Sequence, residues 1–214
     1  VVVDGSQINA GTGDNIASSA VIMNGNETVT DNYVITYDKG ALEVRQAPLT
    51  ITADSDSKVY DGTALTKNSY SSTALKGTDE IKSVTVTGSQ TVVGKSNNVP
   101  SAAEIKNAKG DTVTDNYAIT YDNGVLEVTK ASIAITITAA SDSKEYDGSA
   151  LTNNGYKLTA GTLATNDRIA SVVVDGSQIN AGTGDNIASG AVIMNGTETV
   201  TDHSVITYDK GALE

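Results

Sequence analysis

Few side chains in this sequence are suited to catalysis. The 214 residues include one histidine, His203, and no cysteine. Without cysteine there is no thiolate nucleophile, no disulfide and no zinc–thiolate or iron–sulfur site. One histidine excludes a metal site with several histidine ligands and leaves one candidate for a His-based triad. The sequence TDHS around His203 has two similar counterparts, TDNY at 30–33 and 114–117, in which asparagine takes the place of histidine. We therefore predict that the protein is not an enzyme and has no catalytic residue.

Carboxylates are the other candidates for chemistry. Asp54, Asp56 and Asp61 lie in DSDSKVYDG, and Asp142 and Asp147 lie in the similar segment SDSKEYDG. Loops rich in such oxygens bind Ca²⁺, which takes six to eight oxygen ligands. However, the first aspartate has no counterpart in the second segment, and neither segment has the D-x-[DN]-x-[DN]-G pattern with a distal glutamate. We predict turns capped by aspartate and no cofactor, with Ca²⁺ as the alternative.

Lysine and asparagine also recur, which suggests an intramolecular amide crosslink as another alternative. Such a crosslink needs both side chains buried together beside a carboxylic acid. The recurring residues are Lys58/Lys144, Asn98/Asn186, Asn107/Asn195 and Glu43/Glu127/Glu214. Lysine is usually exposed, and Glu127 alternates with the apolar Leu126 and Val128, so we expect it to face solvent. The crosslink is the less favoured interpretation.

Charge and hydropathy exclude several partners. The chain has 14 Lys+Arg and 26 Asp+Glu, a formal net charge of −12, with no basic cluster to bind nucleic acid or an anionic membrane surface. No apolar run is long enough to span a bilayer. The glycine-rich sequence GTGDN, at 11–15 and 182–186, precedes no helix or lysine that would hold a phosphate, so we predict loops there.

These candidate groups sit in a repeated sequence, and the repeat must position them. Residues 1–43 recur as 172–214 with four differences, namely Ser19/Gly190, Asn26/Thr197, Asn32/His203 and Tyr33/Ser204. At about half that spacing, SKVYDGTALT (57–66) returns as SKEYDGSALT (143–152). The repeat is therefore roughly 85 residues long, enough for a small independent domain.

The repeat divides the chain into two and a half units. We predict the C-terminal half of a unit in 1–46, a complete unit in 47–130 and a nearly complete unit in 131–214. The short linkers RQAP (45–48) and TKAS (129–132) leave little slack between them. We expect the chain to be a fragment of a longer protein. The half unit is then either truncated or completed by another chain.

Alternating residues predict β-strands throughout. Leu49, Ile51 and Ala53 share one face of a strand, as do Ile135, Ile137 and Ala139, and Val84 and Val86 alternate with threonines. Glycine and asparagine interrupt the chain every eight to twelve residues, as expected for short strands. The best helical candidate, 100–107, has a strand-like counterpart at 189–196.

The segment DNYAITYDNGVLEV predicts a β-hairpin. Tyr117, Ile119 and Tyr121 share a face, Asp122-Asn123-Gly124 is the turn with glycine at positive φ, and Leu126 and Val128 return. The motif recurs as YDKG at 37–40 and 208–211.

About seven strands per unit favour tandem immunoglobulin-like β-sandwich modules in an elongated arrangement. A β-grasp-like sheet is the alternative, disfavoured by the missing helix.

All nine tyrosines occupy repeated positions, at 33/117, 37/121/208, 60/146 and 70/156, and the chain has no Phe or Trp. We predict that tyrosine supplies the aromatic volume of the core, with hydroxyls at its edge. An aromatic platform for sugars is the alternative. The repeated Tyr-Asp-Gly, at 60–62 and 146–148, is predicted to be a turn anchored by its tyrosine.

The opening motif S-K-x-Y-D-G-x-x-L-T and the closing motif VTDNYAITYDNGVLEVTKA (113–131) resemble the YDG/MBG-type tandem repeats of bacterial cell-surface proteins and adhesins. The resemblance covers the whole chain and implies β-rich modules, a cell-surface or secreted location and no enzymatic activity. It carries no ligand-binding residue. The N-x-[ST] sequences at Asn26, Asn68 and Asn195 then carry little weight. His203-Ser204 departs from the Asn-Tyr of the closing motif, which we expect to weaken that hairpin locally.

These observations favour a non-catalytic stalk or spacer that holds an adhesive tip away from a bacterial cell. Its expected partners are neighbouring repeats of the same protein. Two alternatives remain open at this point. The repeats bind host glycan or mucin weakly and gain avidity by number, or they self-associate between cells in a biofilm through exposed sheet edges.

Overall fold

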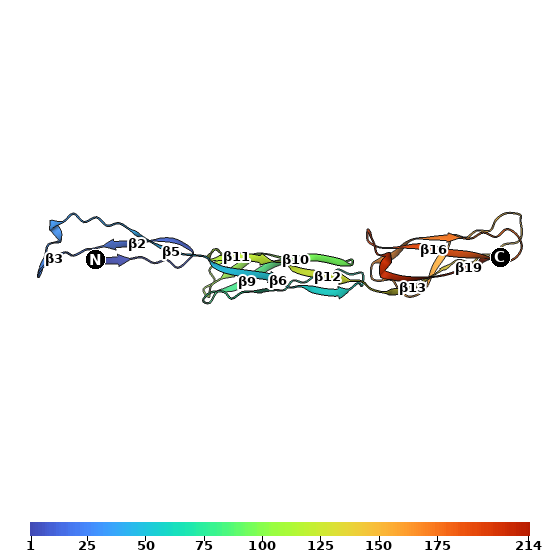
Figure 1. The fold of residues 1–214 in the computed structure, drawn as a ribbon, viewed down its shortest axis with the longest axis horizontal. Helices are drawn as coiled ribbons and strands as arrows, with labels where there is room; N and C mark the ends of the chain where they lie inside the picture. Colours follow the sequence, from blue (N-terminus) through green and yellow to red (C-terminus); the bar gives the residue numbers. More distant parts are fainter. The chain divides into compact units, whose positions relative to one another are not determined.

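The computed structural model describes all residues from 1 to 214 and is built almost wholly of β-strands (Figure 1). Within 1–46 the elements are β1 (Val2–Asp4), β2 (Gly11–Ser18), β3 (Met23–Asn24), β4 (Glu27–Thr28), the 3-10 turn η1 (Thr30–Asn32) and β5 (Gly40–Val44). Within 47–130 they are β6 (Ala47–Ala53), β7 (Asp56–Val59), β8 (Tyr70–Ser72), β9 (Glu80–Thr87), β10 (Gly94–Lys106), η2 (Thr114–Asn116), β11 (Tyr117–Asp122) and β12 (Gly124–Thr129). Within 131–214 they are β13 (Ile133–Ala139), β14 (Tyr156–Ala160), β15 (Asp167–Asp175), β16 (Gly184–Asn195), β17 (Glu198–Thr199), η3 (Thr201–His203), β18 (Ser204–Asp209) and β19 (Gly211–Leu213).

The all-β prediction is confirmed. Seven strands, β6 to β12, lie within 47–130 and seven more, β13 to β19, within 131–214. The helical candidate at 100–107 is strand almost throughout, as part of β10. The predicted loop at 11–15 is wrong, because these residues form the start of β2, and β16 likewise begins at Gly184. Their backbones pair with β5 and β19, so the glycines lie inside sheets.

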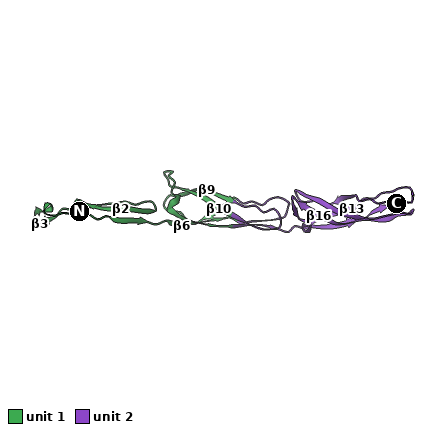
Figure 2. Cartoon of the chain, turned by 90° about the horizontal axis from the view of Figure 1, so that it is seen from above, with its two compact units in different colours: residues 1–54, 68–86, 99–123 green, residues 55–67, 87–98, 124–214 purple.

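The chain forms two compact units, which Figure 2 shows in different colours. Unit 1 comprises residues 1–54, 68–86 and 99–123, and unit 2 comprises 55–67, 87–98 and 124–214. All boundaries between the units fall inside the segment 47–130, and two of them lie within β9 and β10.

Unit 1 contains three small sheets and, in addition, most of β9 and β10, which pair with each other. Strands β1, β2 and β5 form one, in which β2 pairs antiparallel with both neighbours, and β3 and β4 form a two-stranded ribbon. In the third, β6 lies between β11, to which it is parallel, and β8, to which it is antiparallel. The alternation predicted for 49–53 is confirmed, because Leu49 and Ile51 are buried with Ile105 and Tyr117.

Unit 2 repeats much of this arrangement. Strand β13 lies between the parallel β18 and the antiparallel β14. Strand β16 pairs antiparallel with β15, β17 and β19. In the remaining part, β12 pairs with β7 in parallel and with the first residues of β10. The apolar core contains Ile135 and Ile137 as predicted.

The hairpin predicted from the closing motif is wrong. Strand β18 pairs with β13, whereas β19 pairs with β16, so the two strands belong to different sheets. The same holds for β11 and β12. Only Lys210 separates β18 from β19, which is too short for a hairpin turn. The glycine is required for close approach instead, because a Cβ on Gly211 would lie 2.4 Å from the carbonyl oxygen of Ala140.

Candidate functional site

The two Lys-x-Tyr-Asp-Gly turns have the same local structure. Lys58 Nζ donates to Asp61 Oδ1 at 2.6 Å and to the carbonyl and hydroxyl oxygens of Thr63 at 2.7 Å each. Lys144 repeats these bonds with Asp147 at 2.7 Å and with Ser149 at 2.8 Å. The backbone amides of Thr63 and Ser149 each donate to the same aspartate oxygen at 2.9 Å, so the prediction of aspartate-capped turns is confirmed at both places.

These bonds also change the acidity of the two aspartates. The hydrogen bond from Lys58, with those from Thr63, lowers the pKa of Asp61 from 3.8 to about 2. The hydrogen bond from Lys144, followed by those from Ser149, lowers the pKa of Asp147 in the same direction. Both carboxylates are therefore charged and held by their lysines at neutral pH.

The surroundings of Tyr60 are formed by residues far along the chain. Its side chain is 3% exposed and belongs to the apolar core of unit 2. The hydroxyl group donates to Asp167 Oδ1 at 2.5 Å, and the ring centroid lies 4.4 Å from that of His203 at an interplanar angle of 59°. Burial, and then the hydrogen bond to Asp167, raises the pKa of Tyr60 well above its usual range. The hydroxyl therefore acts as a hydrogen-bond donor.

The rest of the turn is held by backbone contacts in unit 2. The amide of Thr165 donates to the carbonyl of Asp61 at 3.0 Å, and Asn195 Nδ2 donates to the carbonyl of Gly62 at 3.2 Å. Asn195 Nδ2 also lies 2.8 Å from Asp167 Oδ1. A Cβ on Gly62 would lie 1.8 Å from the carbonyl oxygen of Thr165, so only glycine fits. We call Tyr60, Gly62, Asp167, Asn195 and His203 the tyrosine site.

In unit 1, a different tyrosine occupies the equivalent position. Asp79 matches Asp167 in the repeat, and it accepts a hydrogen bond at 2.8 Å from Tyr117. Tyr117 packs with Leu49 and Ile51, whose counterparts Ile135 and Ile137 pack with Tyr60. Position 117 corresponds to Ser204, which has no ring.

The His203-Ser204 change therefore coincides with an exchange of one ring for another. In segment 47–130 the repeated aspartate, Asp79, is bound by Tyr117 of the same segment. In 131–214 the matching Asp167 is bound by Tyr60 of the preceding segment. His203 is 5% exposed, so it lines the space that Tyr60 fills. Its Nε2 lies 3.5 Å from Asp202 Oδ1, and its buried Nδ1 has no hydrogen-bond partner. The expected weakening of a hairpin does not apply, since no hairpin forms there.

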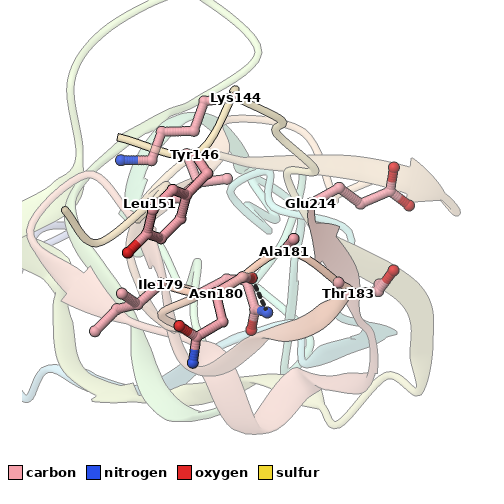
Figure 3. Close-up of a pocket in the computed structure, with 10 residues that line it drawn as sticks. Lys144, Tyr146, Leu151, Ile179, Asn180, Ala181, Thr183 and Glu214 are labelled. Atoms are coloured by element: carbon pink, nitrogen blue, oxygen red, sulfur yellow. Dashed lines mark hydrogen bonds between the residues drawn. The ribbon is translucent and has the colours of Figure 1, made fainter. Parts of the chain in front are cut away.

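The second turn ends in a different environment. Tyr146 is 69% exposed, and its ring borders a groove of about 330 Å³ in unit 2 (Figure 3). Ile179 and Asn180 line the opposite side of the groove, and Leu151 and Lys144 complete it beside the ring.

The aspartates considered for Ca²⁺ each have separate partners. Asp54 accepts from Ser69 at 2.5 Å, Asp56 lies 3.7 Å from Lys67, and Asp61 binds Lys58. Asp142 is 3.3 Å from Asn153. Nowhere in the chain do three His, Asp or Glu side chains come together in an arrangement suited to a metal ion.

The lysines and asparagines considered for a crosslink are also held apart by other partners. Asn98 and Asn186 are fully buried, but Asn98 Nδ2 donates to the carbonyl of Lys67 and Asn186 Nδ2 donates to those of Ala140 and Asn153. Glu127 is 3.2 Å from Lys95. Asn107 forms a hydrogen bond with Asp111, and Asn195 belongs to the tyrosine site. Glu43 is 3.3 Å from Arg45, and the carbonyl of Glu214 accepts a hydrogen bond from the amide of Lys144. Among the N-x-[ST] sequences, Asn26 and Asn68 are exposed.

The predicted core role of tyrosine is confirmed for Tyr60 and Tyr117, which are buried, and is wrong for five others, which are 36% exposed or more: Tyr33, Tyr37, Tyr121, Tyr146 and Tyr156. Tyr37, Tyr121 and Tyr208 each accept a hydrogen bond from the backbone amide of an alanine, at 2.7 to 2.8 Å. These alanines, at 20, 103 and 191, also occupy equivalent positions. Tyr121 is 37% exposed and lies outside the core.

Sequence reasoning missed Asp167 and the role of His203. The signal was present, because Ser204 removes a ring whose hydrogen-bond acceptor, Asp167, is retained. No protein-family model and no curated protein matches the chain. None of its helical segments is long and apolar enough to cross a membrane.

Proposed function

We propose that this chain is a non-catalytic spacer from a bacterial surface adhesin, made of tandem immunoglobulin-like modules of the YDG/MBG type. In this role it lies outside the cell and holds a binding region away from the surface. Its partners are neighbouring repeats, and it needs no cofactor. The motifs at 57–66 and 113–131 support the family, and the all-β architecture supports the module type.

One observation carries the mechanical part of this proposal. Within unit 2, Tyr60 and Leu65 from segment 47–130 share a single apolar core with Ile135 and Ile193 from segment 131–214. A spacer holds a binding region at a distance only when successive repeats resist bending, and contact between nearest neighbours stiffens stacked repeats. The tyrosine site adds directional hydrogen bonds to that shared core, because Tyr60 must meet Asp167 in one geometry.

The proposed aromatic platform for sugars receives less support. Such a platform requires the same tyrosine to be exposed in each repeat. Tyr60 is buried and Tyr146 is exposed, so this pair does not supply it. The shared core around Tyr60 favours the spacer instead.

The stiffness of unit 2 tests the proposal. The chain has no cysteine, so Asn97→Cys and Val205→Cys introduce two spin labels at exposed positions without removing a native thiol. We expect one narrow distance distribution, which Tyr60→Ala broadens because the shared core loses its ring. Tyr146→Ala is the matched control and should leave the distribution narrow. A broad distribution in the unmutated protein would contradict the spacer role.

A further inference from the structure

The groove beside Tyr146 belongs to a surface that occurs three times in the chain. Its residues Ile179, Asn180 and Ala181 correspond to Ile8, Asn9 and Ala10 in the first segment. In segment 47–130 the same positions are occupied by Thr91, Val92 and Val93. We call this surface, with the Lys-x-Tyr-Asp-Gly turn where one is present, the end face of a segment.

The end faces of the two earlier segments each contact the segment that follows, although Ile8 itself stays 84% exposed. In unit 2, Tyr60 and Leu65 are buried and Val92 packs against the same core. In unit 1, the amide of Ala10 donates to Asn116 Oδ1 at 2.8 Å, and Asn116 Nδ2 donates to Asn9 Oδ1 at 3.0 Å. The end face of 131–214 has no such contact, and its Tyr146 is 69% exposed, so we call it the open face.

The contacts of the two earlier end faces indicate which kind of segment the open face would bind. Ile179-Asn180-Ala181 is identical to Ile8-Asn9-Ala10, which binds Asn116. A backbone amide and an asparagine amide at the same positions offer the same donor and acceptor to the same side chain. By contrast, the side chain of Val92, which matches Asn9, has no polar group. The segment that Val92 contacts has His203 where 47–130 has Asn116. The open face therefore matches the Asn116-Tyr117 type of segment.

Unit 1 also contains a space that a Tyr-Asp-Gly turn would fill. A cavity of about 420 Å³ lies beside Asn9 and Asn116, and its lining includes Gly77, Asp79 and Asn107. These last three residues correspond to Thr165, Asp167 and Asn195, which surround Tyr60 and Gly62 in unit 2. Segment 1–46 contains no Lys-x-Tyr-Asp-Gly sequence, whereas 131–214 presents one with its ring exposed.

We propose that the end face of 131–214 is a docking surface for a second copy of segment 47–130. Asn180 and Ala181 bind Asn116 of that copy, as Asn9 and Ala10 do here, and Tyr146 enters the cavity next to Tyr117. Tyr117 already donates to Asp79, so the ring of Tyr146 lies against it rather than replacing it. The inference deepens the spacer role and rests on it, because it names the segment that each end face accepts.

An extended chain tests this contact. Glu214 corresponds to Glu43, so joining a copy of residues 44–130 directly after Glu214 recreates the sequence LEVRQAP. We expect the rate of Tyr146 nitration, followed by peptide mass spectrometry, to fall at least about tenfold, which corresponds to about 1.4 kcal/mol of docking free energy. Tyr33, which is 58% exposed, is the internal control and should react at an unchanged rate.

Two further results decide the outcome. Asn180→Ala in the extended chain should restore much of the Tyr146 reactivity, because Asn116 of the added copy loses its partner. If Tyr146 reacts as fast in the extended chain as in the original one, while the Tyr117 peptide that both copies yield stays protected and thus shows both to be folded, the proposal is overturned. The spin-label distance between positions 97 and 205 does not involve this contact, so the spacer role is judged separately.

A peptide titration covers the case in which the added copy does not fold. A synthetic peptide of residues 141–152 is added to the unextended chain, and amide chemical shifts are followed by NMR. We expect shifts at Gly77, Asp79 and Asn107, and none with a Tyr146→Ser peptide. Equal shifts with both peptides, or none with either, would overturn the proposal.

Discussion

The two Lys-x-Tyr-Asp-Gly turns are alike in local structure and opposite in environment. Lys58 and Lys144 make the same bonds to an aspartate and a hydroxyl residue. Yet Tyr60 is 3% exposed and Tyr146 is 69% exposed. The difference shows that the turn is specified by a few adjacent residues, whereas burial of its tyrosine depends on the segment that it meets. One sequence motif therefore serves either as a buried anchor or as an open surface.

Removing the two rings should give the largest difference. Tyr60→Ala is expected to lower the free energy of unfolding of unit 2 by about 3–5 kcal/mol, because it leaves a cavity in a shared core. Tyr146→Ala should change it by less than about 0.5 kcal/mol, as for most exposed positions. Urea denaturation combined with hydrogen exchange of β13 and β16 amides measures both. Equal losses would mean that Tyr60 is not an anchor.

Replacing the two glycines should separate backbone strain from close packing. Gly62 and Gly148 have φ values of +80° and +79°, so alanine costs about 1 kcal/mol at either position. At Gly62 the new Cβ would also meet the carbonyl oxygen of Thr165, whereas nothing lies within 4 Å at Gly148. We expect a total loss of about 3 kcal/mol for Gly62→Ala and about 1 kcal/mol for Gly148→Ala. Thermal unfolding of the two variants tests this, and the prediction fails if Gly148→Ala is the more harmful.

How much of this comparison was predictable depends on which interactions are local. The strands at 49–53 and 135–139 follow from alternation, because a buried face imposes a period of two wherever the strand lies. The aspartate-capped turns follow from adjacent residues. The hairpin prediction was wrong, because the sequence DNGVLEV does not reveal with which sheet each strand pairs. Tyr60 and Tyr146 have nearly the same neighbours in sequence, so no local pattern distinguishes them.

Restoring a ring at position 204 should sharpen the interpretation of the tyrosine exchange. In unit 1 the ring on the aspartate comes from Tyr117, and Ser204 occupies that position in unit 2. Tyr60→Ala/Ser204→Tyr is therefore expected to recover about 2 kcal/mol of the loss caused by Tyr60→Ala, since a ring refills the cavity. The double variant and both single variants are compared by urea denaturation.

The single variant Ser204→Tyr provides the control for this cycle. With Tyr60 present, two rings compete for one space beside Asp167, and overpacking should destabilise unit 2. If Ser204→Tyr instead stabilises the protein both with and without Tyr60, the two rings do not occupy the same position. The interpretation that Tyr60 replaces a ring at position 204 is then wrong.

Acid should affect both turns alike, and this is the smallest expected effect. The folded pKa of Asp61 is about 2, below its ordinary value of 3.8, and that of Asp147 is shifted in the same direction. A carboxylate with a depressed folded pKa stabilises the protein above its ordinary pKa, and this stabilisation disappears as the pH falls from about 4 toward 2. Both aspartates are exposed and screened by solvent, so each contribution is small. Melting temperatures between pH 5 and pH 2 should fall less steeply in Asp61→Asn and in Asp147→Asn than in the native protein, by similar amounts. A change confined to Asp61→Asn would instead mean that the buried tyrosine strengthens its own turn, so that the two turns are not locally equivalent.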